Sequence, residues 1–192
     1  RSVSRGLGDV YKRQPVEVAQ LTDSLKKQFA PDRRVALLDV DYSFSDKNVM
    51  LRGVTTSAEA KNALLKELAR KGYAVMDCLE LLPDVKGLEG KTCGIINVSV
   101  ANMRVAPDFS SEMMTQSLMG MPVRVLQRDG WVRIQTPDNY IAWVHRVGVH
   151  PVTEEEMAAW NKAEKIVVTA HYGFVYSCLL YTSPSPRDTE RS

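Results

Sequence analysis

The sequence predicts an α+β protein in which a small α-β-β-α-β module precedes a small, strongly bent β-barrel. Residues 15–83 contain apolar residues at helical spacing and segments in which every second residue is apolar, a pattern of packed helices and half-buried strands. Residues 94–152 contain short strand-like runs separated by turn residues, which is typical of small barrels. The polar, glycine-containing residues 84–93 are expected to link the two modules.

The first module is predicted to begin with a helix that Pro31 ends. This helix is indicated by apolar residues three or four positions apart: Val18, Leu21, Leu25 and Phe29. In the following stretch "LLDVDYSF", apolar and polar side chains alternate, which predicts a half-buried strand. The residues "SDKN" are expected to turn the chain into a second strand around "VMLRGV".

A second helix and a third strand are predicted to complete this module. Thr56 and Glu59 have the spacing of a capping box, which would start a helix that carries Leu64 and Leu68. Gly72 is expected to end that helix, and "YAVMDCLELL" then predicts the third strand. Gly53, at the end of the second strand, is explained equally well by a β-bulge or by a close approach of strand and helix.

The second module is predicted to consist of short strands. "GIINVSVANMRVAPDFSSE" predicts a strand followed by a long loop, and three more strands are expected in "GMPVRVLQRDGWVRIQTPDNYIAWVHR". Asp129-Gly130 and Pro137-Asp138-Asn139 mark the turns between them. We expect the Met-rich stretch "EMMTQSLMGM" to be a loop that covers a core. Thr153 and Glu156 form a further capping box, which predicts a helical connector over residues 153–165.

The two ends of the chain are predicted to be foreign to the protein. "DVYKRQ" near the start and "CLLYTS" near the end can be encoded by complementary DNA strands, and the complementarity extends outward on both sides. Inverted repeats of this kind are typical of a transposase end with its sequencing adapter. We therefore expect residues 1–14 and 178–192 to be translated adapter sequence and exclude them from the interpretation of the fold.

The charge of the remaining residues argues against nucleic-acid binding. The excluded ends hold six of the 25 basic and three of the 23 acidic residues, which leaves 19 and 20 and a net charge of −1. So balanced a charge, without a basic stripe, does not predict a nucleic-acid partner. The sequence also lacks an apolar run of the length that a membrane-spanning helix needs.

The motifs of the second module resemble the bacterial SH3 (SH3b) domain. The pattern of that family includes N-x-R-x-x-P, a glycine before "VRVL", and G-W-x-x-V, and this sequence shows Asn102, Arg104 and Pro107, then Gly120, then Gly130-Trp131. It ends on Ala142-Trp143-Val144, where Ala142 replaces the glycine that is usual in the family. The resemblance implies an SH3-like barrel over residues 94–152. Residues 166–177 loosely repeat its first strand and are expected to start a second SH3-like module.

The first module resembles the BON domain, a small unit of bacterial envelope proteins, through "VMLRGVTTSAEAKNALL" with its glycine after the strand. Bacterial SH3 modules also precede the papain-like domain of NlpC-type peptidases, which cleave peptidoglycan stem peptides. The resemblance therefore implies the non-catalytic, substrate-recognising region of such a cysteine peptidase in the cell envelope, periplasmic or secreted, cut before its catalytic domain. The alternative is a stand-alone envelope protein that binds wall peptides or lipid surfaces.

The same resemblance implies candidate binding residues at the rim of the barrel. The SH3 module of these peptidases helps to form the substrate cleft and can bind the free amino end of the stem peptide. Tyr140, which follows a turn, and a nearby carboxylate from Glu112 or Asp138 are the candidates, because a hydroxyl and a carboxylate together suit an ammonium group. A solvated tyrosine with ordinary surface carboxylates explains the same residues equally well.

The sequence predicts no catalytic, metal or cofactor site. Asp77-Cys78 matches half of the Asp-Cys-Ser-Gly motif of these peptidases, but Leu79 follows and the segment is strand-like, so we expect Cys78 to be a small core residue. Cys93 has no evident base partner, and the histidines lack metal-ligand spacing: His145, His150 and His171. Trp131 and Trp143 are expected to pack in the fold rather than to bind a ligand.

Overall fold

The computed structural model describes residues 7–45, 48–167 and 169 and confirms the α+β class. Its first module has the predicted α-β-β-α-β order: α1 (Leu7–Phe29), β1 (Leu38–Ser45), β2 (Asn48–Thr55), α2 (Ala58–Arg70) and β3 (Ala74–Leu81). The second module is mostly antiparallel sheet: β4 (Cys93–Ile96), β5 (Val100–Arg104), β6 (Met113–Leu118), β7 (Pro122–Asp129), β8 (Trp131–Gln135), β9 (Ile141–His145), the 3-10 turn η1 (Arg146–Gly148) and β10 (Val149–Val152). The helix α3 (Glu154–Lys162) follows it.

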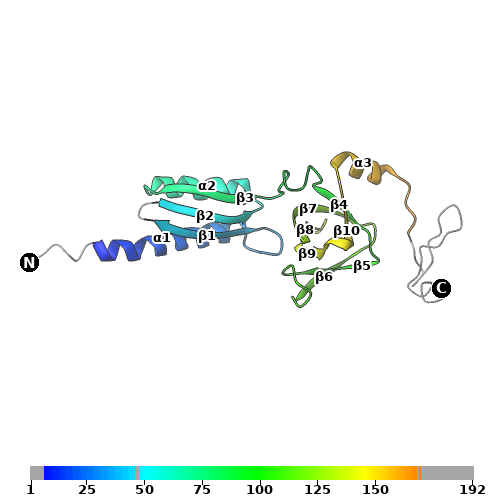
Figure 1. Cartoon of the computed structure of the whole chain (residues 1–192), viewed down its shortest axis with the longest axis horizontal. Coiled ribbons are helices and arrows are strands. Elements are labelled where there is room, and N and C mark those ends of the chain that lie inside the picture. The colour runs from blue at the N-terminus through cyan, green and yellow to red at the C-terminus, as the bar shows by residue number, and fades with distance from the viewer. Residues whose placement is uncertain (1–6, 46–47, 168, 170–192) are drawn as a thin grey trace, which may run out of the picture. The chain divides into compact units, whose positions relative to one another are not determined.

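The first module is a three-stranded sheet covered by two helices, which run alongside it in Figure 1. Strand β2 lies in the centre, antiparallel to β1 and parallel to β3, so α2 is the crossover between two parallel strands. Helices α1 and α2 contact each other and the sheet, because their apolar stripes share one core. The residues of this core that are fully buried include Val18, Val49, Leu51, Ala60, Leu64 and Leu68.

The start of α2 differs from the prediction by one residue. Ser57, not Thr56, caps the helix, because the Ala60 amide donates to its hydroxyl at 3.1 Å. The Thr56 hydroxyl instead accepts from the Leu37 amide at 3.0 Å, while the Thr56 amide donates to the Leu37 carbonyl. Thr56 therefore extends the pairing of β1 and β2 toward the loop that precedes β1. The capping-box prediction was wrong because this tertiary contact competes for the side chain.

The second module is a seven-stranded sheet in the order β10-β4-β7-β8-β9-β5-β6, and in Figure 1 it curls around one core. Alternate residues of its strands point inward, which is why Val123, Val125, Val132, Ile134 and Val144 are all buried. The Met-rich stretch was wrongly predicted as a loop. It contains β6, which pairs with β5 from Val100↔Leu118 to Arg104↔Met113, and buries Ser117.

A third apolar cluster joins the two modules. It contains Leu37 from the loop before β1, Leu82 from the end of the first module, and Leu126 and Ile141 from the barrel. Two backbone hydrogen bonds accompany it: the Ile141 amide donates to the Arg34 carbonyl at 2.6 Å, and the Asp84 amide donates to the Leu126 carbonyl at 2.9 Å. These contacts fix the loop before β1 against the rim of the barrel.

The predicted capping box of the connector is confirmed. The Thr153 amide donates to Glu156 Oε2 at 2.8 Å, and the Glu156 amide donates to Thr153 Oγ1 at 3.2 Å. The described chain up to Trp160 forms one compact unit, and the described residues 161–167 and 169 lie outside it. Within the described ranges, no helix is long and apolar enough to cross a membrane.

The prediction of adapter sequence falls largely outside the described residues. Residues 178–192 and 1–6 are not described, and the expected second module over residues 166–177 is described only at 166, 167 and 169. Helix α1 begins at Leu7 and so includes part of the excluded segment 1–14. Both expectations about the ends remain predictions.

Candidate functional site

A cavity of about 450 Å³ lies where the loop before β1 meets the rim of the barrel. Charged side chains reach it from both modules: Arg33, Arg34 and Asp39 from the first, and Glu112 and Arg133 from the barrel. Its apolar walls include Leu37, Met114, Ile141, Ala142 and Trp143. The combination of apolar walls with a few converging charged groups is typical of small-molecule sites.

The loop at the edge of this cavity is held by Asp32. The Asp32 carboxylate accepts from the Arg34 backbone amide at 2.9 Å and from the Arg34 guanidinium at 2.8 to 3.2 Å. These hydrogen bonds from Arg34 lower the pKa of Asp32 from 3.8 to about 2. The Arg34 carbonyl in this turn accepts from the Ile141 amide of the barrel. The turn at Asp32 and the contact with the barrel therefore stabilise each other.

Asp32 is expected to stay ionised in the folded chain down to about pH 2. A carboxyl with a lowered folded-state pKa stabilises the fold above its ordinary pKa of 3.8 and loses that contribution as the pH falls through about 2. A carbonyl-detected NMR titration measures this directly. Arg34→Gln should return the pKa toward 3.8, whereas Arg33→Gln, the matched loss of charge one residue earlier, should change it much less. An unchanged pKa in Arg34→Gln would contradict this cause.

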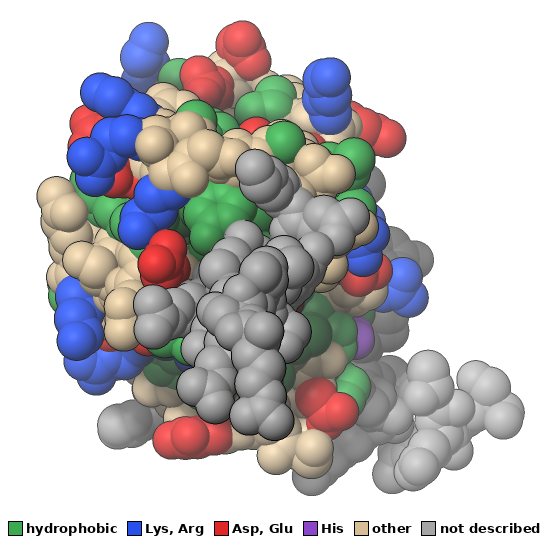
Figure 2. Space-filling view, turned by 90° about the vertical axis from the view of Figure 1, so that its left-hand side faces the viewer, with side chains coloured by type: hydrophobic (Ala, Val, Ile, Leu, Met, Phe, Trp, Pro, Cys, Tyr) green, Lys and Arg blue, Asp and Glu red, His purple; other side chains and the backbone are tan. Residues whose placement is uncertain are grey.

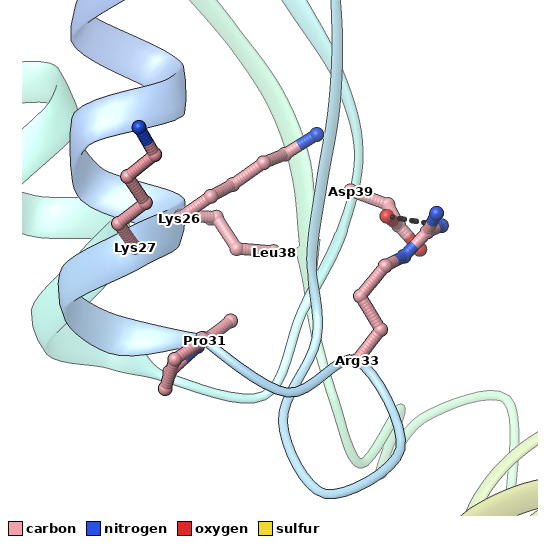
Figure 3. A pocket seen from close by; sticks show the side chains of 7 residues that line it. Lys26, Lys27, Pro31, Arg33, Leu38 and Asp39 are labelled. Atoms are coloured by element: carbon pink, nitrogen blue, oxygen red, sulfur yellow. Dashed lines mark hydrogen bonds and ion pairs between the residues drawn. The ribbon is translucent and has the colours of Figure 1, made fainter.

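Arg33 is paired within its own module. Figure 3 shows its guanidinium meeting the Asp39 carboxylate, at 2.9 Å, beside a second hollow of about 290 Å³ that Lys26 and Lys27 also line. Asp39 lies on β1 and faces both hollows, because Arg33 and Asp39 line the larger cavity as well. The Arg33 charge is therefore largely neutralised before any ligand arrives.

Arg133 differs from the other two arginines. Its side chain leaves the outer face of β8, where the guanidinium lies over the Trp143 ring with its carbon 4.9 Å from the ring centroid. Its Nε is buried without a hydrogen-bond partner. Burial is the main cause that lowers the pKa of Arg133; Arg33 also lowers it and Asp39 raises it.

Of the predicted binding residues, Glu112 lines the cavity. It is exposed at the end of the loop between β5 and β6, and its backbone carbonyl accepts from the Val105 amide at 3.0 Å. The same loop is held by Arg104, whose Nη1 donates to the Ser111 carbonyl at 2.5 Å. Glu112 is thus carried by a loop with fixed ends, and its carboxylate forms no hydrogen bond or ion pair among the described residues.

Tyr140 and Asp138 lie outside the lining of this cavity. The half-buried Tyr140 ring faces the Arg34 guanidinium, whose carbon lies 5.9 Å from the ring centroid. Its backbone is fixed by Thr136: the Tyr140 amide donates to Thr136 Oγ1 at 3.1 Å, and the Thr136 amide donates to the Tyr140 carbonyl at 3.0 Å. Asp138 is exposed in the turn before it. Tyr140 thus lies beside Arg34, which lines the cavity, whereas Asp138 lies in the turn outside the lining.

The two tryptophans within the barrel strands, Trp131 and Trp143, pack on the outside of the barrel rather than in its core. Trp131 contacts Phe109 and His145, with ring centroids 4.8 and 5.3 Å away, and all three line a shallow groove. Trp143 packs against Arg133 and lines the larger cavity. Both rings lie half-buried on the outer face of the sheet. Each therefore packs against neighbouring side chains and also lines a groove or a cavity.

The prediction that Cys78 is a core residue was wrong. Cys78 is exposed on β3, because its neighbour Leu79 takes the buried face of the sheet. Cys93 is half-buried, and burial, with a smaller effect of Glu154, raises the pKa of its thiol. Among the described residues, no group of three or more His, Cys, Asp and Glu side chains is arranged to hold a metal ion.

Cys78 is expected to be alkylated faster than Cys93 at neutral pH. The reactive species is the thiolate, and a raised pKa together with partial burial reduces its amount and access at Cys93. Iodoacetamide labelling followed by peptide-resolved mass spectrometry measures both rates in one sample. In Cys78→Ser the slow rate of Cys93 should remain, and equal rates in the parent chain would contradict the environment described here.

Sequence reasoning missed the three arginines of the cavity. Arg33 and Arg34 lie in a loop that local pattern does not connect to the barrel, and their position depends on the contact between Arg34 and Ile141. Arg133 had one signal: it occupies an outward position of a strand between the buried Val132 and Ile134. Figure 2 shows both acidic and basic side chains on the face it presents.

A comparison with protein families finds a match within the barrel. Residues 103–147, from β5 to η1, match the family model of the bacterial dipeptidyl-peptidase SH3 domain. This confirms the SH3 interpretation of the motifs around Gly130-Trp131 and Trp143-Val144, which lie within the matched segment. No curated protein sequence matches the chain.

Proposed function

We propose that the chain is the non-catalytic recognition region of a bacterial cell-wall cysteine peptidase and that its barrel binds the amino end of a peptidoglycan stem peptide. The observation that carries the proposal is the match of residues 103–147 to the SH3 domain of bacterial dipeptidyl-peptidases. Such a region acts in the cell envelope, beside a papain-like catalytic domain of the parent protein. The first module, by its BON-like pattern, would help to position the barrel there.

Glu112 is the residue that would bind the peptide ammonium group. It lines the cavity at the rim of the matched domain, and its carboxylate has no cationic partner among the described residues. An ammonium group would therefore gain a charge-assisted hydrogen bond without breaking an existing one. Tyr140 would add its hydroxyl from the neighbouring turn, and Asp138 would supply the charge if the peptide enters from that side.

Binding of a stem peptide with a free amine is expected to weaken about tenfold to a hundredfold in Glu112→Gln, the effect of losing one hydrogen bond to a charged group. Titration calorimetry of the full chain, or NMR where binding is weak, measures the change. Glu80→Gln, which removes the same charge from an exposed position on β3, is the matched control and should bind as the parent chain does.

Acetylating the peptide amine should remove the difference between the parent chain and Glu112→Gln, because the group being bound is gone. Tyr140→Phe and Asp138→Asn, tested on the same pair of peptides, identify which of the other two candidates contributes. A free-amine peptide and its acetylated form that bind equally well to the parent chain would exclude recognition of the amino end.

The chain itself is expected not to hydrolyse stem peptides. Cys78 is exposed on a strand, and burial raises the pKa of the Cys93 thiol, whereas a nucleophilic cysteine needs a lowered pKa and an adjacent base. Incubation under reducing conditions, followed by mass spectrometry, should show the intact peptide. Turnover that disappears in Cys78→Ala or Cys93→Ala would contradict the proposal of a non-catalytic region.

A further inference from the structure

The charges of the cavity between the loop before β1 and the barrel rim do not cancel in pairs. Arg33 is paired with Asp39 at 2.9 Å, and Arg34 with Asp32 at 2.8 Å. Arg133 has neither an ion pair nor a hydrogen bond to any described residue, and its Nε is buried without an acceptor. One guanidinium therefore remains available for an anion from outside the chain.

This guanidinium is held in a position that costs free energy in the empty cavity. A buried donor without an acceptor pays a desolvation penalty that a hydrogen bond would offset. The Asp39 carboxylate attracts this guanidinium but is already hydrogen-bonded to Arg33, whose positive charge opposes that attraction. The cation–π contact with Trp143 covers one face of the guanidinium and leaves its in-plane N–H groups for a planar acceptor.

The cavity fits a small carboxylate better than a phosphate. Because the other two arginines are already neutralised, one positive charge faces one ligand charge, and a guanidinium matches a carboxylate in a bidentate geometry. The volume of about 450 Å³ and the walls from Leu37, Ile141 and Met114 suit a ligand with a short apolar part. Glu112, on the same cavity, would repel a second negative charge.

We propose that Arg133 binds a carboxylate of the peptide whose ammonium group Glu112 binds, so that the cavity recognises a short peptide end carrying both charges. This inference rests on the proposed function for the identity of the peptide. D-Glutamate in the stem peptide supplies such a carboxylate. Arg133 and Glu112 come from β8 and from the loop before β6, so the barrel alone provides both charges.

The test uses the full chain and the dipeptide alanyl-D-glutamine, whose single carboxylate is the α-carboxylate and whose side-chain amide stands for the stem-peptide bond, together with its α-amidated form. The parent chain should bind the amidated peptide about tenfold to a hundredfold more weakly, the effect of losing a charge-assisted contact to Arg133. Arg133→Gln should bind both forms equally weakly. Arg133→Lys should recover part of the preference, because it keeps the charge and loses the bidentate geometry.

Arg128→Gln is the matched control, because Arg128 is an exposed arginine of β7 outside the cavity lining, and it should bind as the parent chain does. Thermal unfolding by circular dichroism shows whether each variant is folded. Arg133→Met keeps an unbranched apolar side chain beside Trp143, so it provides a second variant without the guanidinium. Inorganic phosphate should not compete with the dipeptide.

Two results overturn the inference: equal binding of acid and amide by the parent chain, or an Arg133→Gln variant that retains the full preference for the acid. A failure of the proposed function has a different signature. If acetylation of the amine and Glu112→Gln have no effect while the acid is still preferred through Arg133, the cavity binds carboxylates without reading an amino end. If inorganic phosphate competes effectively with the dipeptide, the cavity binds anions in general rather than a carboxylate. That result also overturns the inference.

Discussion

Gly53→Ala is expected to lower the free energy of unfolding by about 2–4 kcal/mol, the combined cost of backbone strain and overpacking. Gly53 has a φ of 129°, which L-residues rarely adopt. A Cβ built there would clash with the carbonyl oxygen of Asp39 and lie 3.3 Å from the Cα of Val40. The strand opposite Gly53 would have to move, because these neighbours are backbone atoms in the β1–β2 register.

Gly72→Ala is the matched control for this prediction. Gly72 also has a positive φ, 81°, but a Cβ there meets nothing within 4 Å. Its substitution should therefore cost only the left-handed conformation, about 1 kcal/mol. Urea unfolding followed by circular dichroism measures both values. If Gly53→Ala lowers the free energy of unfolding no more than Gly72→Ala does, β1 can move away from the added Cβ at no cost, and the prediction is wrong.

The first prediction also reaches the candidate site. Asp39, whose carbonyl Gly53 approaches, is the residue whose carboxylate pairs with Arg33 at the cavity. A shift of β1 would therefore move one charged group of the lining. The sequence left two interpretations of Gly53 open, a β-bulge and a close approach of strand and helix. The structure shows a close approach, but to the paired strand β1 and not to a helix.

The fold could be predicted from the sequence to the extent that local pattern controls it. The α-β-β-α-β order follows from the change between helical and alternating apolar spacing, and the turn at Gly130 follows from residues that favour turns. The prediction was wrong where a tertiary contact or a pairing partner decides. The Thr56 hydroxyl accepts from the Leu37 amide instead of capping α2. The Met-rich stretch forms β6 because it pairs with β5.

The site was predictable only in part. Glu112 was named as a candidate through the resemblance of the barrel, and it lines the cavity; its role in binding stays a prediction. Arg33, Arg34 and Arg133 were not identified, because the cavity forms where two separate parts of the sequence meet. No local pattern encodes that meeting. It depends on the buried contact of Leu37 with the barrel residues Leu126 and Ile141.

Leu126→Ala is expected to lower the free energy of unfolding by about 2–5 kcal/mol, the range for removing a buried leucine side chain. Leu126 is fully buried. It lies at a β-bulge, where the register of β7 and β8 shifts between Val125 and Gln127. The bulge breaks the alternation of the strand, so Val125 packs into the barrel core while Leu126 packs into the cluster shared with the first module.

The loss of this leucine should also loosen the loop that forms the cavity. The Ile141 amide, which donates to the Arg34 carbonyl, is the local reporter. In Leu126→Ala its native-state hydrogen exchange should accelerate more than that of amides in the β1–β2 ladder, because the loop can detach before either core unfolds. Binding of the acidic dipeptide should weaken in parallel, since Leu37, which forms part of the apolar wall of the cavity, moves with the loop.

Leu64→Ala is the matched control, because Leu64 is equally buried but lies in the core of the first module. It should cost a similar free energy of unfolding and accelerate exchange mainly in the β1–β2 ladder. The comparison separates loss of global stability from release of the loop. If the Ile141 amide exchanges at the same rate in both variants, the cluster around Leu126 does not hold the loop, and the cavity must be maintained by the Asp32–Arg34 turn alone.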